Sequence, residues 1–249
     1  MVPRADGRRQ CCPWATNGYD GRVARLVLFD IDMTLIRTSG AGRSAVNTVL
    51  SRLSGVEQAT AGIRFDGRTD RGIFLEALET HGLVNGDPDA AFEAFVAHYL
   101  EELPRSLSAR GGIVLPGVHA LLDAFDARGQ KVGLATGNIE RAARVKLAHF
   151  GLWERFAAGG FGDRTPVRAE LVGEAIAALA AAAGASPDPA DAIVLGDTPL
   201  DVEAAHLAGA RCLAVATGSF AARALQESGA DWVFDDLSDT RRVLEILLG

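Results

Sequence analysis

Short runs of consecutive apolar residues recur along this chain, and they restrict its fold more than any other feature of the sequence. The run Leu26-Val27-Leu28-Phe29 contains no polar side chain, which is typical of a strand buried on both faces of a sheet. Comparable runs follow at residues 131–135, 192–195, 212–216 and, more weakly, 232–234.

Helix-like stretches rich in Ala and Leu separate these runs, at residues 117–128, 138–149, 168–183, 199–208 and 220–228. Strands that alternate with helices predict an α/β fold, with a Rossmann-like parallel sheet and helices on both faces. Ligands of such sheets bind beyond the carboxyl ends of the strands. The residues that directly follow each strand are therefore the first candidates for a site.

One long segment interrupts the alternation. Residues 43–110 have helical periodicity and hardly any strand signal, which predicts an inserted helical domain between core segments 23–42 and 111–249. Its expected helices cover residues 44–53, 71–79 and 90–103. Gly40-Ala41-Gly42 and Gly111-Gly112 flank the insert and are candidate hinges. Residues 1–22 show no periodicity and are predicted to form a disordered leader.

Composition restricts the compartment and the partners. A formal net charge of −7 argues against a nucleic-acid partner, and no apolar run approaches the ~20 residues that span a bilayer. No apolar region follows the basic N-terminus, so a secretory signal is not expected. Three cysteines without disulfide or zinc spacing fit a reducing cytoplasm. Whether the protein is a monomer or a homodimer stays open.

Two carboxylates, Asp30 and Asp32, follow the first predicted strand. One carboxylate can attack phosphorus and form an acyl phosphate, while the second can protonate the leaving oxygen and later activate water. Anionic side chains that face an anionic substrate need a cation, which indicates Mg²⁺ on oxygen ligands. The alternative is that both residues only shape a turn or cap a helix.

Two later strand ends also carry polar residues. Thr136-Gly137-Asn138 can bind phosphoryl oxygens at a helix start, or can simply cap that helix. The later strand end carries the segment Gly196-Asp197-Thr198-Pro199-Leu200-Asp201. Helix capping is sufficient to explain Thr198 as an N-cap and Asp201 as a first-turn carboxylate. It does not explain Asp197, which makes Asp197 the better candidate for a metal ligand.

The joint order of these motifs resembles the haloacid dehalogenase superfamily over about residues 24–240. The matching residues are Asp30, Asp32 and Thr34 in the first motif, Thr136 in the second, and Gly196, Asp197 and Asp201 in the fourth. The resemblance implies that Asp30 is the nucleophile and a Mg²⁺ ligand. It makes Asp32 the general acid/base, with its backbone carbonyl on the metal. Asp197 and Asp201 would complete the metal site, and Thr136 would bind the phosphoryl group.

The resemblance also assigns a role to the insert. It becomes a cap that closes over the site and excludes water, and residues 65–70 are similar to the substrate loop of phosphoglycolate phosphatase-like members. Gly67, Arg68 and Thr69 would then face the substrate, opposite Thr34, Gly137 and Asn138 on the core. The alternative is a tight turn with an N-cap at Thr69 or Asp70.

The chain departs from the family pattern at two places. Met33 stands where many members have Gly, and no Lys-Pro marks the third motif, which normally supplies a cation. We predict that Arg168 fills this role, because Arg always carries charge and can hold two oxygens. Arg164 is the second candidate. Lys146, the only lysine that could fill the role, is the third candidate, and we interpret it as a surface residue because Arg141 and Arg144 lie close to it in sequence.

The expected function is a Mg²⁺-dependent phosphatase that hydrolyses a small phosphate monoester, phosphoglycolate-like or a sugar phosphate, through an aspartyl-phosphate intermediate. Two alternatives stay open at this stage. A phosphosugar mutase would use the same loops, and a non-catalytic phosphate-binding protein would use the same anion contacts without the nucleophile.

Overall fold

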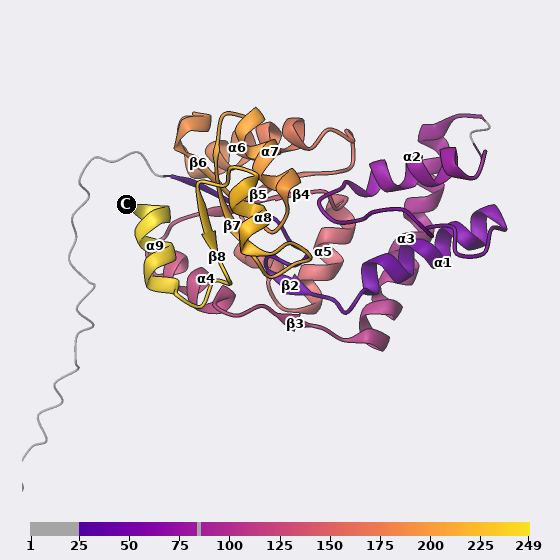
Figure 1. Cartoon of the computed structure of the whole chain (residues 1–249), viewed down its shortest axis with the longest axis horizontal. Coiled ribbons are helices and arrows are strands. Elements are labelled where there is room, and N and C mark those ends of the chain that lie inside the picture. Colours follow the sequence, from indigo (N-terminus) through magenta and orange to yellow (C-terminus); the bar gives the residue numbers. More distant parts are fainter. Residues whose placement is uncertain (1–24, 84–85) are drawn as a thin grey trace, which may run out of the picture.

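The computed structural model describes residues 25–83 and 86–249, so the predicted leader lies outside the described residues. Six parallel strands form one sheet in the order β5-β4-β1-β6-β7-β8, which confirms the predicted fold class (Figure 1). The strands are β1 Leu26–Phe29, β4 Val132–Thr136, β5 Ala158–Phe161, β6 Ala192–Gly196, β7 Arg211–Val215 and β8 Trp232–Phe234.

Strand β1 lies in the middle of the sheet, between β4 and β6. Phe29, its last residue, pairs in register with Leu134 and with Leu195. The three strands therefore end at nearly the same level, and the loops that follow them meet at one edge of the sheet. This edge is where parallel α/β sheets bind ligands.

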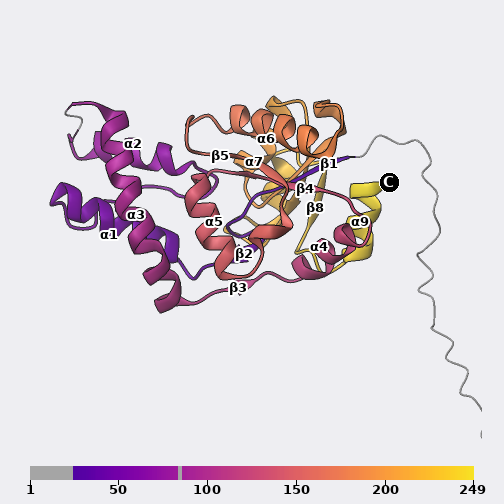
Figure 2. The same ribbon diagram turned by 180° about the vertical axis from the view of Figure 1, so that it is seen from behind.

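Helices cover both faces of the sheet (Figures 1 and 2). Helices α4 (Val118–Asp126), α5 (Glu140–His149) and α9 (Thr240–Leu248) contribute to one apolar core, and α6 (Arg168–Ala183), α7 (Pro199–Leu207) and α8 (Ala222–Glu227) contribute to the other. Because side chains alternate along a strand, β1 sends Val27 and Phe29 into the first core and Leu26 and Leu28 into the second. This explains its fully apolar sequence.

Three further helices form a separate layer beyond the carboxyl edge of the sheet: α1 (Ala41–Ser54), α2 (Asp70–Thr80) and α3 (Pro88–Arg110). They pack around their own apolar core, in which the ring of Tyr99 stacks on that of Phe95 at 5.5 Å between centroids. We call this layer the cap. Its helix α1 begins at Ala41, two residues before the expected start of the insert.

The two connections between cap and core lie side by side. Strands β2 (Ile36–Arg37) and β3 (Ile113–Val114) pair in antiparallel fashion, and next to them Gly40 and Gly111 have φ of 76° and 68°. These angles lie in the left-handed region, which glycine enters at little cost. Gly42, by contrast, is an ordinary helical residue of α1.

The sequence pattern does not predict strand β5 or helix α9. The β5 sequence is Ala-Gly-Gly-Phe, and glycine has low strand propensity because it has no side chain to pack. Close packing requires glycine at position 160, because a Cβ there would lie 2.1 Å from the Leu171 carbonyl oxygen of α6. Two short 3₁₀ turns, η1 (Trp153–Arg155) and η2 (Pro189–Asp191), complete the described elements.

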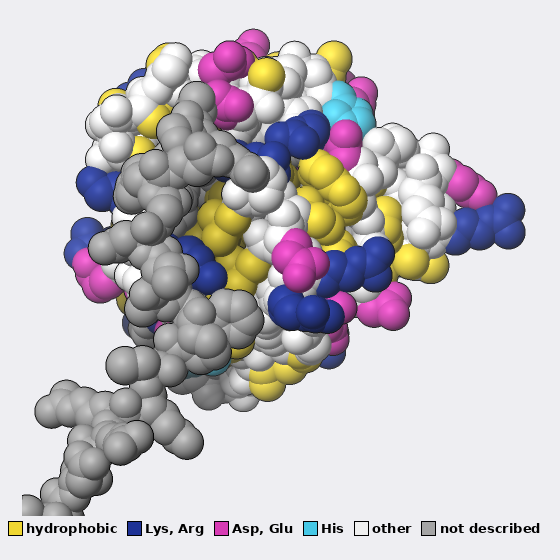
Figure 3. All heavy atoms as spheres, turned by 90° about the vertical axis from the view of Figure 1, so that its left-hand side faces the viewer, with side chains coloured by type: hydrophobic (Ala, Val, Ile, Leu, Met, Phe, Trp, Pro, Cys, Tyr) yellow, Lys and Arg dark blue, Asp and Glu magenta, His cyan; other side chains and the backbone are white. Residues whose placement is uncertain are grey.

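The end of the molecule opposite the cap is viewed in Figure 3, where hydrophobic patches are interrupted by basic and acidic side chains. This end is remote from the carboxyl edge of the sheet. No helix in the described part of the chain combines the length and apolar character needed to cross a membrane.

Candidate active site

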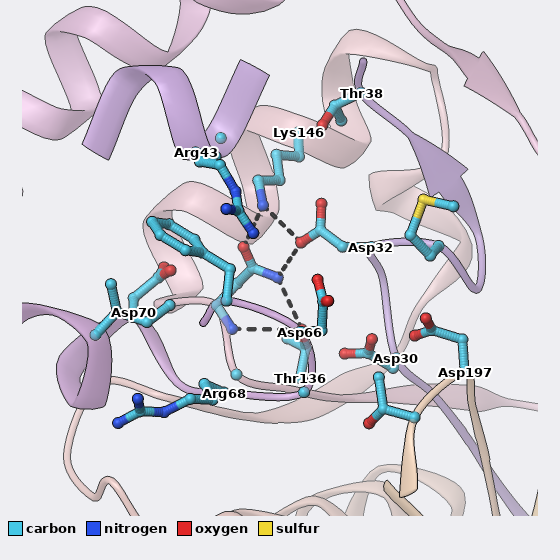
Figure 4. A pocket seen from close by; sticks show the side chains of 18 of the residues that line it. Asp30, Asp32, Thr38, Arg43, Asp66, Arg68, Asp70, Thr136, Lys146 and Asp197 are labelled. Carbon is cyan, nitrogen blue, oxygen red and sulfur yellow. Dashed lines mark hydrogen bonds and ion pairs between the residues drawn. The ribbon is translucent and has the colours of Figure 1, made fainter. Parts of the chain in front are cut away.

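A cavity of about 250 Å³ lies between the carboxyl edge of the sheet and the cap. Its floor carries Asp30, Asp32, Thr136 and Asp197, which follow or end the three central strands. Residues of α1, α3 and the loop before α2 form its other walls. Figure 4 shows the carboxylates of the floor and the cationic side chains that converge on this space.

Three buried carboxylates meet on one side of the floor. One carboxylate oxygen from each of Asp30, Asp197 and Asp201 lies within 4.8 Å of the other two. Asp30 is fixed by its backbone N–H, which donates to the Leu195 carbonyl at 2.8 Å. Asp197 packs so closely on Gly218 that a Cβ there would lie 1.8 Å from Oδ2. This set of hard oxygen donors could hold a metal ion.

Arg168, the first residue of α6, brings positive charge to these carboxylates. Its Nη2 lies 3.1 Å from Oδ1 of Asp30, its Nε donates to Oδ1 of Asp201 at 2.9 Å, and its Nη1 donates to the Gly67 carbonyl at 3.2 Å. The guanidinium therefore holds two carboxylates and a cap loop at once. Arg164 is exposed and does not line the cavity.

The crowding of carboxylates changes their pKa values. Burial, with smaller contributions from Asp201 and Asp32, raises the pKa of Asp30 to about 7, although Arg168 lowers it. Burial and the neighbouring Asp201 and Asp30 raise the pKa of Asp197 to about 9. Charged forms are disfavoured at both positions because the carboxylates are buried and because one guanidinium faces three of them. A divalent cation at this place would relieve that repulsion.

Asp201 differs from the other two carboxylates because both of its oxygens are already engaged. Oδ2 accepts from the backbone N–H of Thr198 at 3.0 Å and from its hydroxyl at 2.7 Å, which completes a capping box at the start of α7. Oδ1 accepts from Arg168. The Asp197 side chain, in contrast, accepts no hydrogen bond from any described residue, so Asp197 is the freer ligand.

Asp32 is held apart from the three carboxylates, on the side of the cap. Its Oδ2 lies 2.6 Å from Nζ of Lys146 and accepts from Nδ2 of Asn138 at 2.8 Å. Asn138 Oδ1 accepts from Lys146 at 2.5 Å, and its Nδ2 also donates to the Thr136 hydroxyl at 2.9 Å. Figure 4 shows this network as dashed lines. Asn138 thus links the phosphate-site candidate Thr136 to Asp32.

Lys146 is buried, and its interpretation as a surface residue was wrong. Only 4% of it is exposed, because it lies on the same face of α5 as Ala142 and Ala143, one helical turn earlier. The exposed Arg141 points away from this face. Burial lowers the pKa of Lys146, but the neighbouring Asp32 and other carboxylates outweigh it and leave the pKa above its ordinary value, so the side chain stays charged.

The predicted substrate loop packs directly onto the core. The backbone N–H of Asp70 donates to the Gly137 carbonyl at 2.8 Å, and Oδ2 of Asp70 accepts from the N–H of Ile139 at 3.0 Å. A Cβ on Gly67 would lie 2.5 Å from the Thr198 hydroxyl. Close approach of the two loops therefore accounts for the glycines on both sides.

Within this loop the predicted substrate contacts separate. Gly67 and Arg68 line the cavity, as do Gly137 and Asn138 on the core. The guanidinium of Arg68, however, forms an ion pair with Glu76 of α2 and points away from Asp30 in Figure 4. Thr69 is the N-cap of α2, and its hydroxyl accepts a hydrogen bond from the N–H of Gly72 at 3.0 Å. This is the helix-capping role that was the alternative to a substrate contact.

Thr34 lies outside the cavity. It is 1% exposed, and its hydroxyl has no hydrogen-bond partner among the described residues. Met33 lines the cavity and has φ of 63°, a conformation that costs glycine less than other residues. Gly would adopt this turn at a lower cost than Met does.

The cavity residues that were not predicted include Arg43 and Tyr99. Each lies on a cap helix that the sequence places only as part of an insert. Their spacing along the chain carries no signal, because they reach the cavity only when the cap packs on the core.

Known proteins resemble this chain in sequence and in fold. The family described as haloacid dehalogenase-like hydrolase matches residues 27–206. A phosphoglycolate phosphatase of Rhodospirillum rubrum is 31% identical over 87% of this chain and 89% of its own, and phosphoglycolate phosphatase 1 of Pseudomonas aeruginosa is 29% identical over 88% and 79%. The crystal structure of CbbY from Rhodobacter sphaeroides in complex with phosphate superimposes with a TM-score of 0.66 at 21% identity, covering 88% of this chain and 96% of that one.

Proposed function

The chain belongs to the haloacid dehalogenase-like hydrolases, and from this we propose that it is a Mg²⁺-dependent phosphatase acting on a small phosphate monoester through a phosphoaspartate at Asp30. One observation carries the proposal. Arg168 holds Oδ1 of the buried Asp30 at 3.1 Å, while Asp32 lines the same cavity on a separate network. A protein that only binds phosphate gains nothing from a nucleophile beside an independent acid.

In the first half-reaction a carboxylate oxygen of Asp30 attacks phosphorus, and the bond between phosphorus and the ester oxygen breaks. Asp32 transfers its proton to the leaving oxygen, so the product departs as a neutral alcohol. Arg168 and the Thr136 hydroxyl bind the non-bridging oxygens of the transferring group, where negative charge is concentrated.

In the second half-reaction Asp32, now a carboxylate, takes a proton from water. The resulting oxygen attacks phosphorus of the acyl phosphate, inorganic phosphate leaves, and Asp30 is restored as a carboxylate. Asp32 ends protonated, ready for the next cycle. Lys146 and Asn138 keep Asp32 on the cap side of the cavity, where the leaving group and then the water must lie.

The metal site follows from the donor chemistry. Asp30 and Asp197 are the residues that would hold Mg²⁺, with Asp201 as a support that positions Arg168. Their oxygens are the hard donors that Mg²⁺ prefers, and their raised pKa values reflect charge that a cation would neutralise. When bound, Mg²⁺ supplies charge neutralisation and orientation of the phosphoryl group.

The substrate class is a short phosphate monoester of the phosphoglycolate type. The cavity of about 250 Å³ is small and closed on one side by the docked loop at residues 65–70. Curated relatives that cover most of the chain are named phosphoglycolate phosphatase. Cationic side chains from both cap and core line the cavity on a protein whose net charge is negative.

The test is metal-dependent release of phosphate from phosphoglycolate and from an aryl phosphate, with and without EDTA. We expect release that EDTA abolishes and that Asp30→Asn lowers by at least about 10⁴-fold. Borohydride added during turnover should reduce the acyl phosphate and convert residue 30 to homoserine, which peptide mass spectrometry detects. No release from any phosphate ester in the presence of Mg²⁺ would contradict the proposal.

A further inference from the structure

A buried hydroxyl and a buried ammonium group lie together in the corner of the cavity beside Asp32. The Tyr99 side chain is fully buried in α3, yet its hydroxyl has no hydrogen-bond partner among the residues that the structure describes. A buried hydroxyl without a hydrogen-bond partner is energetically unfavourable. Such a group in a cavity wall indicates a ligand atom that accepts its hydrogen bond.

Lys146 supplies a second donor at the same place. An ammonium group has three N–H donors, and the described partners of Lys146, Asp32 and Asn138, use two of them. A Cβ built on Gly42 would meet Lys146 Nζ at 3.2 Å and the Tyr99 hydroxyl at 3.8 Å. Both donors therefore converge on the bare backbone of Gly42, and both line the cavity.

Arg43 brings a further positive charge to this corner. It follows Gly42 on α1 and lines the cavity, and its guanidinium lies 4.4 Å from the centroid of the Phe65 ring. It forms no ion pair with a carboxylate in the described ranges. Arg68 of the predicted substrate loop does not add its charge to this corner, because its guanidinium forms an ion pair with Glu76.

We propose that Tyr99, Lys146 and Arg43 form a subsite for a carboxylate on the leaving group of the substrate, one or two carbons from the ester oxygen. The inference rests on the proposed function, because Asp32 marks where the ester oxygen must lie. Two of the three donors are cationic, and charge-assisted hydrogen bonds to a carboxylate are about twice as strong as neutral ones.

Two carboxylates of the cap also line this side of the cavity. Asp70 is turned to the N–H of Ile139 through Oδ2, which accepts that hydrogen bond, and burial raises its pKa to about 6. Asp66 is exposed, so water and salt screen it. Burial, with smaller effects of Asp70 and Asp32, raises the pKa of the Tyr99 hydroxyl well above its ordinary value, so it remains a donor.

The test uses two non-hydrolysable ligands, so it does not depend on turnover. 3-Phosphonopropionate carries the phosphonate and the carboxylate, and propylphosphonate has a methyl group in place of the carboxylate. We expect the wild-type protein with Mg²⁺ to bind the first about 10-fold to 100-fold more tightly by calorimetry. Tyr99→Phe should remove about tenfold of this preference, and its affinity for propylphosphonate should stay unchanged.

Arg43→Gln, at an exposed position, should also reduce the preference, and Arg105→Gln on the exposed side of α3 is its matched control. Lys146 is not used for this test because it also contacts Asp32. Equal wild-type affinities for the two ligands, or a preference that survives both Tyr99→Phe and Arg43→Gln, would overturn the subsite while leaving the phosphatase proposal standing. Binding of neither ligand would overturn both.

A ligand with a hydroxyl group in place of the carboxylate completes the binding experiment. If 3-hydroxypropylphosphonate binds as tightly as 3-phosphonopropionate, the carboxylate assignment is wrong and the corner accepts hydroxyl groups instead. Tyr99→Phe should unfold at a temperature no lower than the wild type, because the ring and its stacking on Phe95 remain and only a buried hydroxyl that has no partner among the described residues is removed. That control separates lost binding from lost folding.

Discussion

The candidate site has two halves that are built in different ways. The core half contains Asp30, Asp197, Asp201 and Arg168, which the ends of strands and the starts of helices position directly. The cap-facing half contains Asp32, Asn138, Lys146 and the cap residues above them. The core half depends on sheet register alone, while the cap-facing half also depends on how α1 and α3 pack on α5. We therefore expect the core half to govern the chemical step, and the cap-facing half to govern the leaving group.

The largest expected effect is in the core half. Arg168→Met should lower kcat by about 10²- to 10³-fold, because it removes the charge that faces Asp30 and the transferring phosphoryl group. Arg168→Lys should recover part of this loss, since one ammonium can replace only one of the two contacts. The measurement is steady-state phosphate release at saturating Mg²⁺.

The exposed Arg164 is a matched control for this change. Arg164→Met should leave kcat within about twofold of the wild type, because an exposed charge is screened and contributes little. If both substitutions have equal effects, Arg168 is not the third-motif cation, and the division between the halves is misplaced.

The second prediction concerns the cap-facing half. Lys146→Met should lower kcat by about 10- to 100-fold for an alkyl phosphate, because Asp32 loses the partner that orients it for proton transfer. In the first half-reaction, measured as the burst of alcohol or phenol release before the phosphoaspartate is hydrolysed, an aryl phosphate should be affected much less, since a nitrophenolate departs without a proton. The ratio of the two rates is the measurement.

Lys131 provides the control, because it is the only other lysine of the chain. It is exposed and donates to the Ala182 carbonyl at 2.5 Å, far from the cavity. Lys131→Met should change neither rate. Equal losses on alkyl and aryl phosphates in Lys146→Met would show that Lys146 supports folding or phosphate binding and does not orient the acid.

The two halves also differ in how much of each can be predicted from sequence. Asp30 and Asp197 follow buried strands, so the sheet brings them together whatever the insert does. Arg168 begins a helix beside them, and sequence position alone makes it the candidate. Lys146 was misread because the buried face of α5 is defined by the cap packed against it. Tyr99 had no signal at all, since its role depends on where its hydroxyl ends after α3 packs.

The same reasoning explains the error in the fold. In strand β5, Gly160 packs against α6, and Gly159 packs against Leu134 and Phe161. A pattern built on apolar side chains cannot detect a strand in which close packing excludes them. For Lys146 and for β5 alike, contacts with residues far away in the sequence determine the structure, and the local sequence does not reveal those contacts.

The third prediction uses the raised pKa values of the core half. The pKa of Asp30 rises from 3.8 in the unfolded chain to about 7, and that of Asp197 to about 9. A group whose pKa is raised by folding stabilises the fold below its unfolded pKa, and this stabilisation is lost as the pH rises through the folded value. The metal-free protein should therefore become less stable between about pH 4 and pH 9 because of these groups.

Mg²⁺ should reverse this trend by binding the ionised carboxylates. Chemical denaturation across this pH range, with EDTA and with Mg²⁺, measures both effects. Asp197→Asn should flatten the pH dependence in EDTA and should weaken the response to Mg²⁺. A metal-free protein whose stability rises steadily with pH would contradict the assignment of the shifts to this cluster.

The smallest expected effect tests Thr69, which the resemblance places at the substrate and the structure places at the N-cap of α2. Thr69→Ala should lower the free energy of unfolding by about 1 kcal/mol through loss of the cap, and Thr69→Ser should restore it. Because the hydroxyl is engaged with Gly72 and does not line the main cavity, kcat and KM should stay within about twofold of the wild type. A large rise in KM that Ser reverses, without a change in stability, would return Thr69 to the substrate and would extend the cap-facing half beyond Tyr99, Lys146 and Arg43.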